Sequence, residues 1–263
     1  MSEQTAAGMA RAILDAHLNR LSYENMPGGN VASTDFAYAV QEELVGLFQR
    51  AGEGAIGGWK LGMTTAPMQR RTGISGPAAG AILRRRMHMS GAVLSAAQFM
   101  HMGLEGEIAL RVSHPFPETE AIAAAQVRGR LDGVAAAFEI TDDRNADWSR
   151  LSAAPLIADN IWNMGVVLGP ARPLRDAGAL MGRRGMVCVN DAVRDEGMSD
   201  DVGCDHLELV AWLAAHVAGR GLPLQPGQWI MTGSFVPTRF PDAGDRYRFT
   251  IDGLPSVEVA IAG

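Results

Sequence analysis

Two apolar segments of the chain carry glutamates where a buried β-strand would place them inside the protein. Residues 104–112 and 136–142 consist mainly of aliphatic and small residues, which is typical of strands buried on both faces. Glu105 and Glu107 lie two residues apart, so in a strand both side chains project from the same face, about 6 to 7 Å apart along the backbone. Gly106 between them has no side chain, so another group can approach there closely. The fold must therefore accommodate these two carboxylates and a third, that of Glu139, in largely apolar surroundings.

Carboxylates in an apolar environment are unfavourable unless they are paired or bound to a cation. Three that meet on one side of a sheet would repel each other by up to about 4 kcal/mol per close pair at an effective dielectric of about 20. A divalent cation with oxygen ligands is one compensation. The alternative is that each glutamate lies on a hydrated face or pairs with an arginine, and Arg111 and Arg144 are near in sequence. The spacing alone leaves both interpretations open.

Composition narrows the class of protein. The chain has 263 residues, 47% of them hydrophobic and 20% charged, which suits a globular protein with a sizeable core. A formal net charge of −6 argues against nucleic acid as a partner. The two cysteines predict reduced thiols and no disulfide framework. No apolar stretch is long enough for a membrane span and no signal peptide is recognisable, so we expect a cytoplasmic protein.

The remaining pattern predicts a β-rich α+β fold with helices at the N-terminus. We expect an N-terminal helical cap or interface segment over residues 1–54 and a β-rich catalytic domain over residues 55–263. Predicted helices cover residues 5–21, 34–52, 67–71, 118–127, 150–159 and 205–221. Predicted strands cover residues 59–64, 92–94, 104–112, 136–142, 163–169 and 229–231, with hairpins over 186–193 and 247–261.

Other candidate site residues lie on these strands or at their ends. Lys60 is flanked by Trp59 and Leu61, and it can anchor a carboxylate or donate a proton if it is buried. The local sequence by itself favours a lysine on an edge strand that discourages aggregation. Gly233 and Ser234 end a strand at a corner that could present backbone N–H groups, although most such corners are only turns. Phosphate-loop, dinucleotide-binding and nucleophile-elbow motifs are absent from the sequence.

Several segments, taken in order, resemble the hydratase/decarboxylase branch of the fumarylacetoacetate hydrolase superfamily, which includes 2-keto-4-pentenoate and 2-oxohept-4-ene-1,7-dioate hydratases. The resemblance extends from about residue 35 to the C-terminus. The segments that carry it are Tyr38-Ala39-Val40-Gln41, Gly58-Trp59-Lys60-Leu61-Gly62-Met63-Thr64, Glu105-Gly106-Glu107-Ile108-Ala109, Phe138-Glu139-Ile140 with Asp142 and Arg144, Ala158-Asp159-Asn160, Val210-Ala211-Trp212-Leu213-Ala214 and Gly233-Ser234-Phe235.

This resemblance implies a β-rich roll or barrel with N-terminal helices, in a homo-oligomer. It implies that Glu105, Glu107 and Glu139 bind Mg²⁺ or Mn²⁺ and that Lys60 lines the substrate pocket as an anchor or proton donor. Asp159, Trp162, Gly233 and Ser234 complete the substrate-binding residues that we expect. The implied activity is that of a lyase of aromatic-type catabolism that adds water to a small 2-hydroxy-2,4-dienoate or 2-oxo-enoate.

The alternatives are a decarboxylase of a 2-oxo-3-enedioate, or a non-catalytic partner subunit that associates with such a decarboxylase or hydratase. Three departures from the family pattern bear on the choice. Pro77-Ala78-Ala79 stands where many pentadienoate hydratases carry an acidic residue, and Ile161-Trp162 replaces small residues that border the active site. The usual His-Pro pair before the last helix is missing from residues 203–207. The arginine run 84–86 could receive the second carboxylate of a diacid, or face solvent or another subunit.

Overall fold

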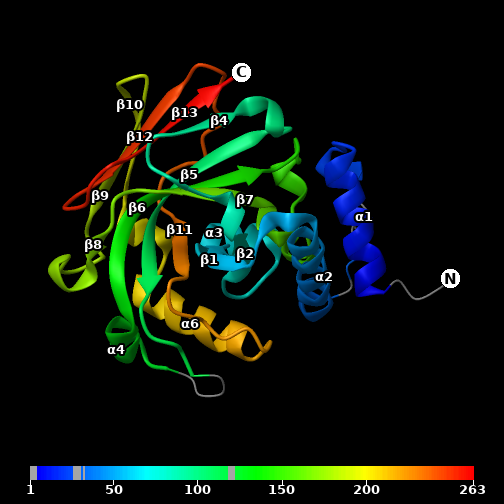
Figure 1. Cartoon of the computed structure of the whole chain (residues 1–263), viewed down its shortest axis with the longest axis horizontal. Coiled ribbons are helices and arrows are strands. Elements are labelled where there is room, and N and C mark those ends of the chain that lie inside the picture. Colours follow the sequence, from blue (N-terminus) through cyan, green and yellow to red (C-terminus); the bar gives the residue numbers. More distant parts are fainter. Residues whose placement is uncertain (1–4, 26–30, 32, 118–121) are drawn as a thin grey trace.

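The computed structural model describes residues 5–25, 31, 33–117 and 122–263 (Figure 1). Its α-helices are α1 (Ala6–Leu18), α2 (Thr34–Phe48), α3 (Ala66–Thr72), α4 (Ala124–Val127), α5 (Ala153–Ala158) and α6 (His206–Ala218). Its strands are β1 (Ile56–Gly62), β2 (Ala78–Leu83), β3 (Met87–Met89), β4 (Ala92–Ser95), β5 (Met102–Val112), β6 (Leu131–Asp142), β7 (Asn163–Leu168), β8 (Arg172–Pro173), β9 (Arg184–Val189), β10 (Ala192–Met198), β11 (Trp229–Ser234), β12 (Arg246–Ile251) and β13 (Val257–Ala262).

The strands form two sheets that share one core. The larger sheet has the order β2-β1-β11-β5-β6-β7-β3, with β8 beside β6, and the smaller one has the order β10-β9-β12-β13-β4. The larger sheet is strongly curled, so that β2 near one end contacts β7 near the other. The described strands do not close it into a barrel. The prediction of a β-rich α+β roll with N-terminal helices is confirmed.

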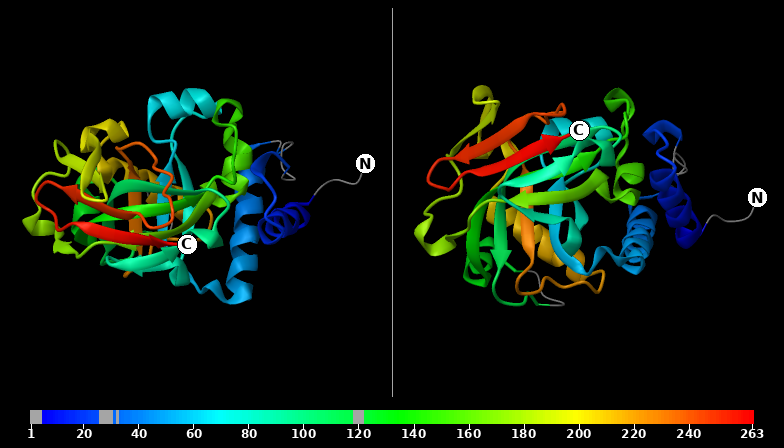
Figure 2. Two further views of the ribbon diagram at one scale, coloured as in Figure 1. Left: turned by 90° about the horizontal axis from the view of Figure 1, so that it is seen from above. Right: turned by 45° about the horizontal axis from the view of Figure 1, so that its top comes forward.

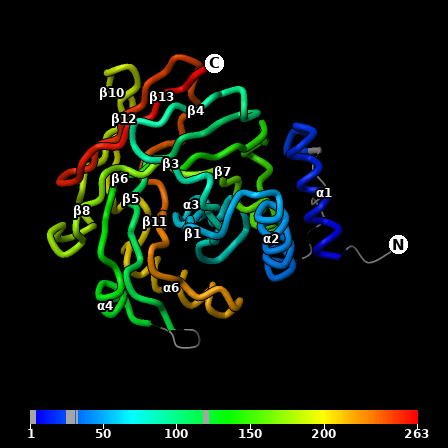
Figure 3. Tube along the Cα trace, viewed as in Figure 1, coloured from blue at the N-terminus to red at the C-terminus, as the bar shows by residue number. Residues whose placement is uncertain are grey.

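Helices cover two sides of the larger sheet. Figures 1 and 2 show α1 and α2 side by side at one flank, away from the smaller sheet, and α2 also packs against α5. Helix α6 lies across the sheet at β11. In the Cα trace, the C-terminal strand β13 runs beside β4 (Figure 3). The proposed division of the chain at residue 54 stays a prediction.

Strands β5 and β6 fix the positions of the three glutamates. They pair antiparallel along almost their full length, and the register places Glu105 directly opposite Glu139 and Glu107 opposite Ala137. Paired residues on neighbouring strands point to the same face of a sheet, so all three carboxylates project to one side. On the other face, a Cβ at Gly106 would lie 2.9 Å from ring atoms of Phe249. The group that approaches Gly106 closely is therefore the ring of Phe249 in the core.

Lys60 is buried because β1 is an internal strand, which contradicts the edge-strand interpretation. Strand β1 pairs with β2 on one side and with β11 on the other, and Lys60 is only 3% exposed. Gly80 stands opposite Lys60 on β2. A Cβ at Gly80 would lie 3.1 Å from Cγ of Lys60 and 2.9 Å from the carbonyl oxygen of Asn160. Glycine at this position therefore leaves room for the stem of the lysine.

Most predicted elements are present within a few residues, but some differ. The helix predicted over 118–127 is limited to α4 among the described residues, and positions 118–121 lie outside them. Strand β2 was not predicted, because Ala78–Leu83 is buried on both faces and therefore shows no alternation of polar and apolar residues. Both cysteines are free, as expected. None of the described helices is long and apolar enough to cross a membrane.

Candidate metal centre and its cavity

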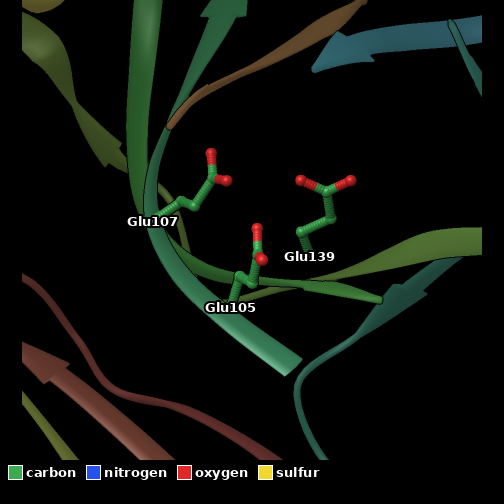
Figure 4. A group of neighbouring side chains, drawn as sticks. All are labelled: Glu105, Glu107 and Glu139. Carbon is green, nitrogen blue, oxygen red and sulfur yellow. The ribbon is translucent and has the colours of Figure 1, made fainter. Parts of the chain in front are cut away.

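Glu105, Glu107 and Glu139 point toward one another from β5 and β6 (Figure 4). One carboxylate oxygen from each lies within 4.8 Å of the corresponding oxygens of the other two. Glu107 and Glu139 are fully buried, and Glu105 is partly exposed. The structure thus brings together the three acidic residues that the sequence singled out. Neither Arg111 nor Arg144 pairs with them, because Arg111 binds Asp132 and Arg144 binds Asp159.

Each of these carboxylates is held by the protein through one oxygen. Oε2 of Glu107 accepts a hydrogen bond of 2.7 Å from the peptide N–H of Gly233, and Oε1 of Glu105 accepts one of 2.6 Å from the hydroxyl of Thr238. Oε1 of Glu139 accepts from the amide of Asn163 at 3.0 Å. Oε1 of Glu107 and Oε2 of Glu139 are buried with no hydrogen-bond partner among the described residues. Buried polar atoms are rarely left unsatisfied, so these two oxygens indicate a missing ligand.

The electrostatics of the cluster lead to the same conclusion. Burial, with repulsion from the neighbouring glutamates, raises the pKa of Glu107 well above its ordinary value. Burial also raises the pKa of Glu139 to about 7, although Lys60 and Asn163 oppose the shift. Metal ligands must be deprotonated, and three ionised carboxylates against one ammonium would leave an excess of two negative charges. This donor set, all oxygen and doubly negative, fits a hard divalent cation.

Lys60 is the cationic side chain of this site. Its Nζ lies 3.2 Å from Oε1 of Glu139 and donates to the carbonyl oxygen of Ile161 at 3.4 Å. Burial alone would lower the pKa of Lys60, but the three glutamates outweigh it and the pKa stands above its ordinary value. Lys60 is therefore an ammonium group fixed between the acidic cluster and the loop that follows α5.

That loop has an unusual backbone. Asn160, Ile161 and Trp162 have φ of +51°, +48° and +58°, a left-handed conformation that costs non-glycine residues about 1–2 kcal/mol each. The side chain of Asn160 ties the loop to β2 by bonding both the N–H and the carbonyl oxygen of Ala81, each at 2.8 Å. The turn places the carbonyl of Ile161 against Lys60 and the side chains of Ile161 and Trp162 at the cavity beside it. Strain of this kind is typical of functional sites.

A cavity of about 320 Å³ opens next to the cluster. Lys60 and Glu105 line its charged end, and Gly233, Ser234 and Trp162 also line it. Gly233 has a φ of +99°, which favours glycine, and this conformation directs its N–H to Glu107. The Ser234 hydroxyl donates to the carbonyl oxygens of Gly106 and Val236, so it holds the turn after β11.

Asp159 does not belong to the cavity, contrary to our expectation of substrate contact. It is fully buried between α1 and α5, where His17 lies 2.7 Å from its Oδ1 and Arg144 binds its Oδ2. Burial would raise the pKa of Asp159, but Arg144 and His17 outweigh it and hold the pKa below its usual value. The arginine run 84–86 also lies outside the residues that line the cavity, and Arg86 pairs with Glu53.

Sequence reasoning missed four residues that support the site. Asn163 and Thr238 each hold a glutamate, Gly80 makes room for Lys60, and Trp148 lines the cavity with Trp162. An amide at the start of the apolar segment 163–169 was a usable signal for Asn163. Thr238 lies in an irregular segment and Trp148 in a 3-10 helix of three residues, and both are too short of regular structure for a periodicity to mark their neighbours.

Comparison with known proteins agrees with this geometry. Residues 72–262 match the family described as fumarylacetoacetate (FAA) hydrolase C-terminal. The chain belongs to the fumarylacetoacetate hydrolase family. The resemblance inferred from the sequence motifs is thereby confirmed.

The relatives with names include hydratases, and a decarboxylase is among the similar solved structures, as the resemblance of the sequence motifs implies. The chain is 31% identical over 235 residues to a 2-oxo-hept-4-ene-1,7-dioate hydratase of Escherichia coli, covering 84% of each protein. It is 30% identical over 241 residues to a 2-keto-4-pentenoate hydratase of Burkholderia vietnamiensis, covering 89% of this chain and 87% of the relative. A solved 4-oxalocrotonate decarboxylase from Pseudomonas putida G7, complexed with magnesium and adipate, has the same fold, with a TM-score of 0.85 at 24% identity over 97% of both chains.

Proposed function

We propose that this protein is a metal-dependent hydratase that adds water to a small 2-hydroxy-2,4-dienoate or its 2-oxo-enoate form. One observation carries the proposal: two buried carboxylate oxygens, with no partner in the described part of the chain, lie in an acidic cluster beside Lys60, next to a cavity of small-molecule size. The named hydratases among the relatives support the reaction class.

Glu105, Glu107 and Glu139 would hold the metal ion, which we propose to be Mg²⁺ or Mn²⁺. The residues present fit such an ion, because two of their oxygens have no partner among the described residues and the ionised cluster would lack two positive charges. When bound, the ion would supply a Lewis acid and a template for a 2-oxo carboxylate. In solved relatives of this fold, the bound ions include magnesium and calcium.

Lys60 would act directly on the substrate. Its ammonium lies at the charged end of the cavity and can bind the carboxylate of the substrate, which lowers the free energy of placing an anion beside three glutamates. In the alternative role, with the carboxylate held elsewhere, Nζ would donate a proton to the far carbon of the dienol before water adds. Glu139, in contact with Nζ, keeps that group in place.

The residues around Lys60 would orient it and exclude water. The carbonyl of Ile161 fixes the direction of one N–H bond of Lys60, and Gly80 leaves space for its stem. Gly233 holds Glu107 so that only one of its oxygens remains unpartnered. Trp162, at 6% exposed, lines the cavity and would limit the water that reaches the reacting carbons.

A chelator experiment tests this function. The purified protein is incubated with 2-hydroxypenta-2,4-dienoate and Mg²⁺, and the loss of dienol absorbance is followed. We expect turnover that stops with a chelator and returns with excess Mg²⁺. Undiminished turnover in chelator would contradict the proposal. A Lys60→Ala variant should lose most activity, and unchanged turnover would remove Lys60 from the mechanism.

A decarboxylase of a 2-oxo-3-enedioate shares the metal and Lys60 but releases CO₂. Measuring CO₂ from such a dioate beside hydration of the dienoate separates the two activities. Absence of both activities, together with failure to bind Mg²⁺ and oxalate, would instead favour a non-catalytic partner subunit. The homo-oligomeric state, an association with a pathway decarboxylase and the cytoplasmic location stay predictions.

A further inference from the structure

The larger sheet has an open edge beside the candidate site. Strand β2 is the last strand of that sheet, and among the described strands it pairs with β1 alone. An edge strand leaves the backbone N–H and C=O groups of every second residue without a neighbouring strand. On β2 these groups belong to Ala79 and Ala81, which flank Gly80, the residue opposite Lys60. Both alanines are buried, so their backbone groups need partners within the protein.

Three side chains supply those partners. The hydroxyl of Tyr38 accepts from the N–H of Ala79 at 3.1 Å, and the amide of Gln41 donates to the carbonyl oxygen of Ala79 at 2.9 Å. The side chain of Asn160 bonds both backbone groups of Ala81, each at 2.8 Å. Tyr38, Gln41 and Asn160, which we call the edge clamp, thus take the place of a neighbouring strand along β2.

The edge clamp joins β2 to the segments that surround Lys60. Tyr38 and Gln41 belong to α2, which lies beside the β2 end of the sheet (Figure 1). The amide of Gln41 also donates to the carbonyl oxygen of Ile157 on α5 at 2.9 Å, so it ties α5 to β2. Asn160 directly precedes Ile161, whose carbonyl oxygen accepts from Nζ of Lys60. The clamp therefore fixes both the strand opposite Lys60 and the carbonyl that binds its ammonium.

The fit around the stem of Lys60 leaves little tolerance for movement. A Cβ at Gly80 would lie 2.9 Å from the carbonyl oxygen of Asn160 and 3.1 Å from Cγ of Lys60, so strand, loop and lysine are in close contact. A shift of β2 or of the loop would change where Nζ lies relative to Glu139, now 3.2 Å away. In an active site, a displacement of about 1 Å can lower the rate about 100-fold.

We propose that Tyr38, Gln41 and Asn160 are positioning residues, which act on the reaction by holding Lys60 at the glutamate cluster. None of the three is among the described residues that line the cavity, so they act through Lys60 and not by contact with the substrate. The inference rests on the proposed function and deepens it. It also gives α2, which the sequence analysis assigned to a cap or interface segment, a part in the site.

A double-mutant cycle between Asn160 and Lys60 tests this role. Asn160→Gly removes the amide and keeps the backbone, because glycine adopts the φ of +51° found there without strain. We measure kcat/KM on 2-hydroxypenta-2,4-dienoate with Mg²⁺ for both single variants and the double variant. We expect Asn160→Gly to lower kcat/KM at least about tenfold in the wild-type chain and less than about twofold in Lys60→Ala, because the group that it positions is then absent.

Equal losses in the two backgrounds, or no loss in Asn160→Gly, would overturn the positioning role and leave the hydratase proposal standing. Absence of turnover in the wild-type protein would overturn the proposed function and the positioning role with it. The two failures are therefore distinguishable.

Tyr38→Phe tests the edge clamp without depending on turnover. It keeps the ring that packs against His216 and under Arg220, and it removes the acceptor for the N–H of Ala79. Hydrogen exchange of the Mg²⁺-loaded chain, followed by mass spectrometry, should be about threefold faster or more in peptides that cover β2, because one hydrogen bond is lost. Tyr247→Phe, on β12 of the smaller sheet, is the control and should leave β2 unchanged. Unchanged exchange of β2 in Tyr38→Phe would contradict a strand held by the clamp.

Discussion

Two buried acidic groups near the end of α5 differ in how their charge is balanced. Asp159 is fully buried, yet Arg144 and His17 surround it and its pKa falls. Glu107 and Glu139 are equally buried, but Lys60 is the one cationic side chain that contacts them among the described residues, and their pKa values rise. The side chains around Asp159 balance its charge, whereas the side chains around Glu107 and Glu139 do not supply enough positive charge.

This difference separates a structural role from a binding role. A buried ion pair ties α1 to the loop through His17, and its loss would disturb packing. A buried cluster with unsatisfied oxygens is unfavourable for the protein alone and favourable once a cation binds. Substitutions in the two groups should therefore have opposite consequences for the metal-free protein.

The largest expected effect on stability is that of Asp159→Asn. Loss of this carboxylate leaves Arg144 buried beside a neutral amide, and breaking a buried pair typically costs about 3–5 kcal/mol. Urea denaturation followed by circular dichroism measures the change in the free energy of unfolding. The control is Asp132→Asn, which breaks the exposed pair with Arg111 and should cost at most about 1 kcal/mol. Similar small losses in both variants would mean that the Asp159 cluster is not the balanced group described here.

Glu107→Gln should affect activity and leave metal-free stability intact. The amide oxygen can still accept from Gly233, but one ligand charge is lost, so we expect metal-dependent turnover to fall at least about 100-fold. Without metal, the melting temperature should stay the same or increase, because the variant loses a buried acid whose ionised form is poorly compensated. Thermal melts in chelator test this second part. A large drop in melting temperature would show that Glu107 stabilises the fold as Asp159 does.

Thr238→Val should have a smaller effect. The threonine hydroxyl holds Oε1 of Glu105, and losing an outer partner of a ligand typically weakens metal affinity about tenfold. Mg²⁺ titration calorimetry measures the affinity, and Thr250→Val serves as a control on β12, away from the cluster. Unchanged affinity in Thr238→Val would place Glu105 outside the metal site.

The sequence predicts the glutamate cluster better than it predicts the pairing of Asp159 with Arg144 and His17. Two-residue spacing in an apolar segment was enough to place Glu105 and Glu107 on one face, and a second apolar segment marked Glu139 as a third carboxylate. The family resemblance implied that the three bind a metal ion and that Lys60 lines the pocket. The pairing of His17 with Asp159 joins residues 142 positions apart, and no local pattern indicates it. Asp159 was therefore predicted at the substrate. Burial of Lys60 likewise depends on β2, which shows no alternation, and on Gly80 opposite it.

Metal stoichiometry tests the central claim most directly. Mn²⁺ bound per chain is counted by equilibrium dialysis for the wild-type protein and for Glu107→Gln, with Asp132→Asn as a folded control that removes an exposed carboxylate. We predict one tightly bound ion per chain in the wild-type protein and in Asp132→Asn, and loss of that ion in Glu107→Gln. The same stoichiometry and affinity in all three would show that the glutamate cluster binds no metal.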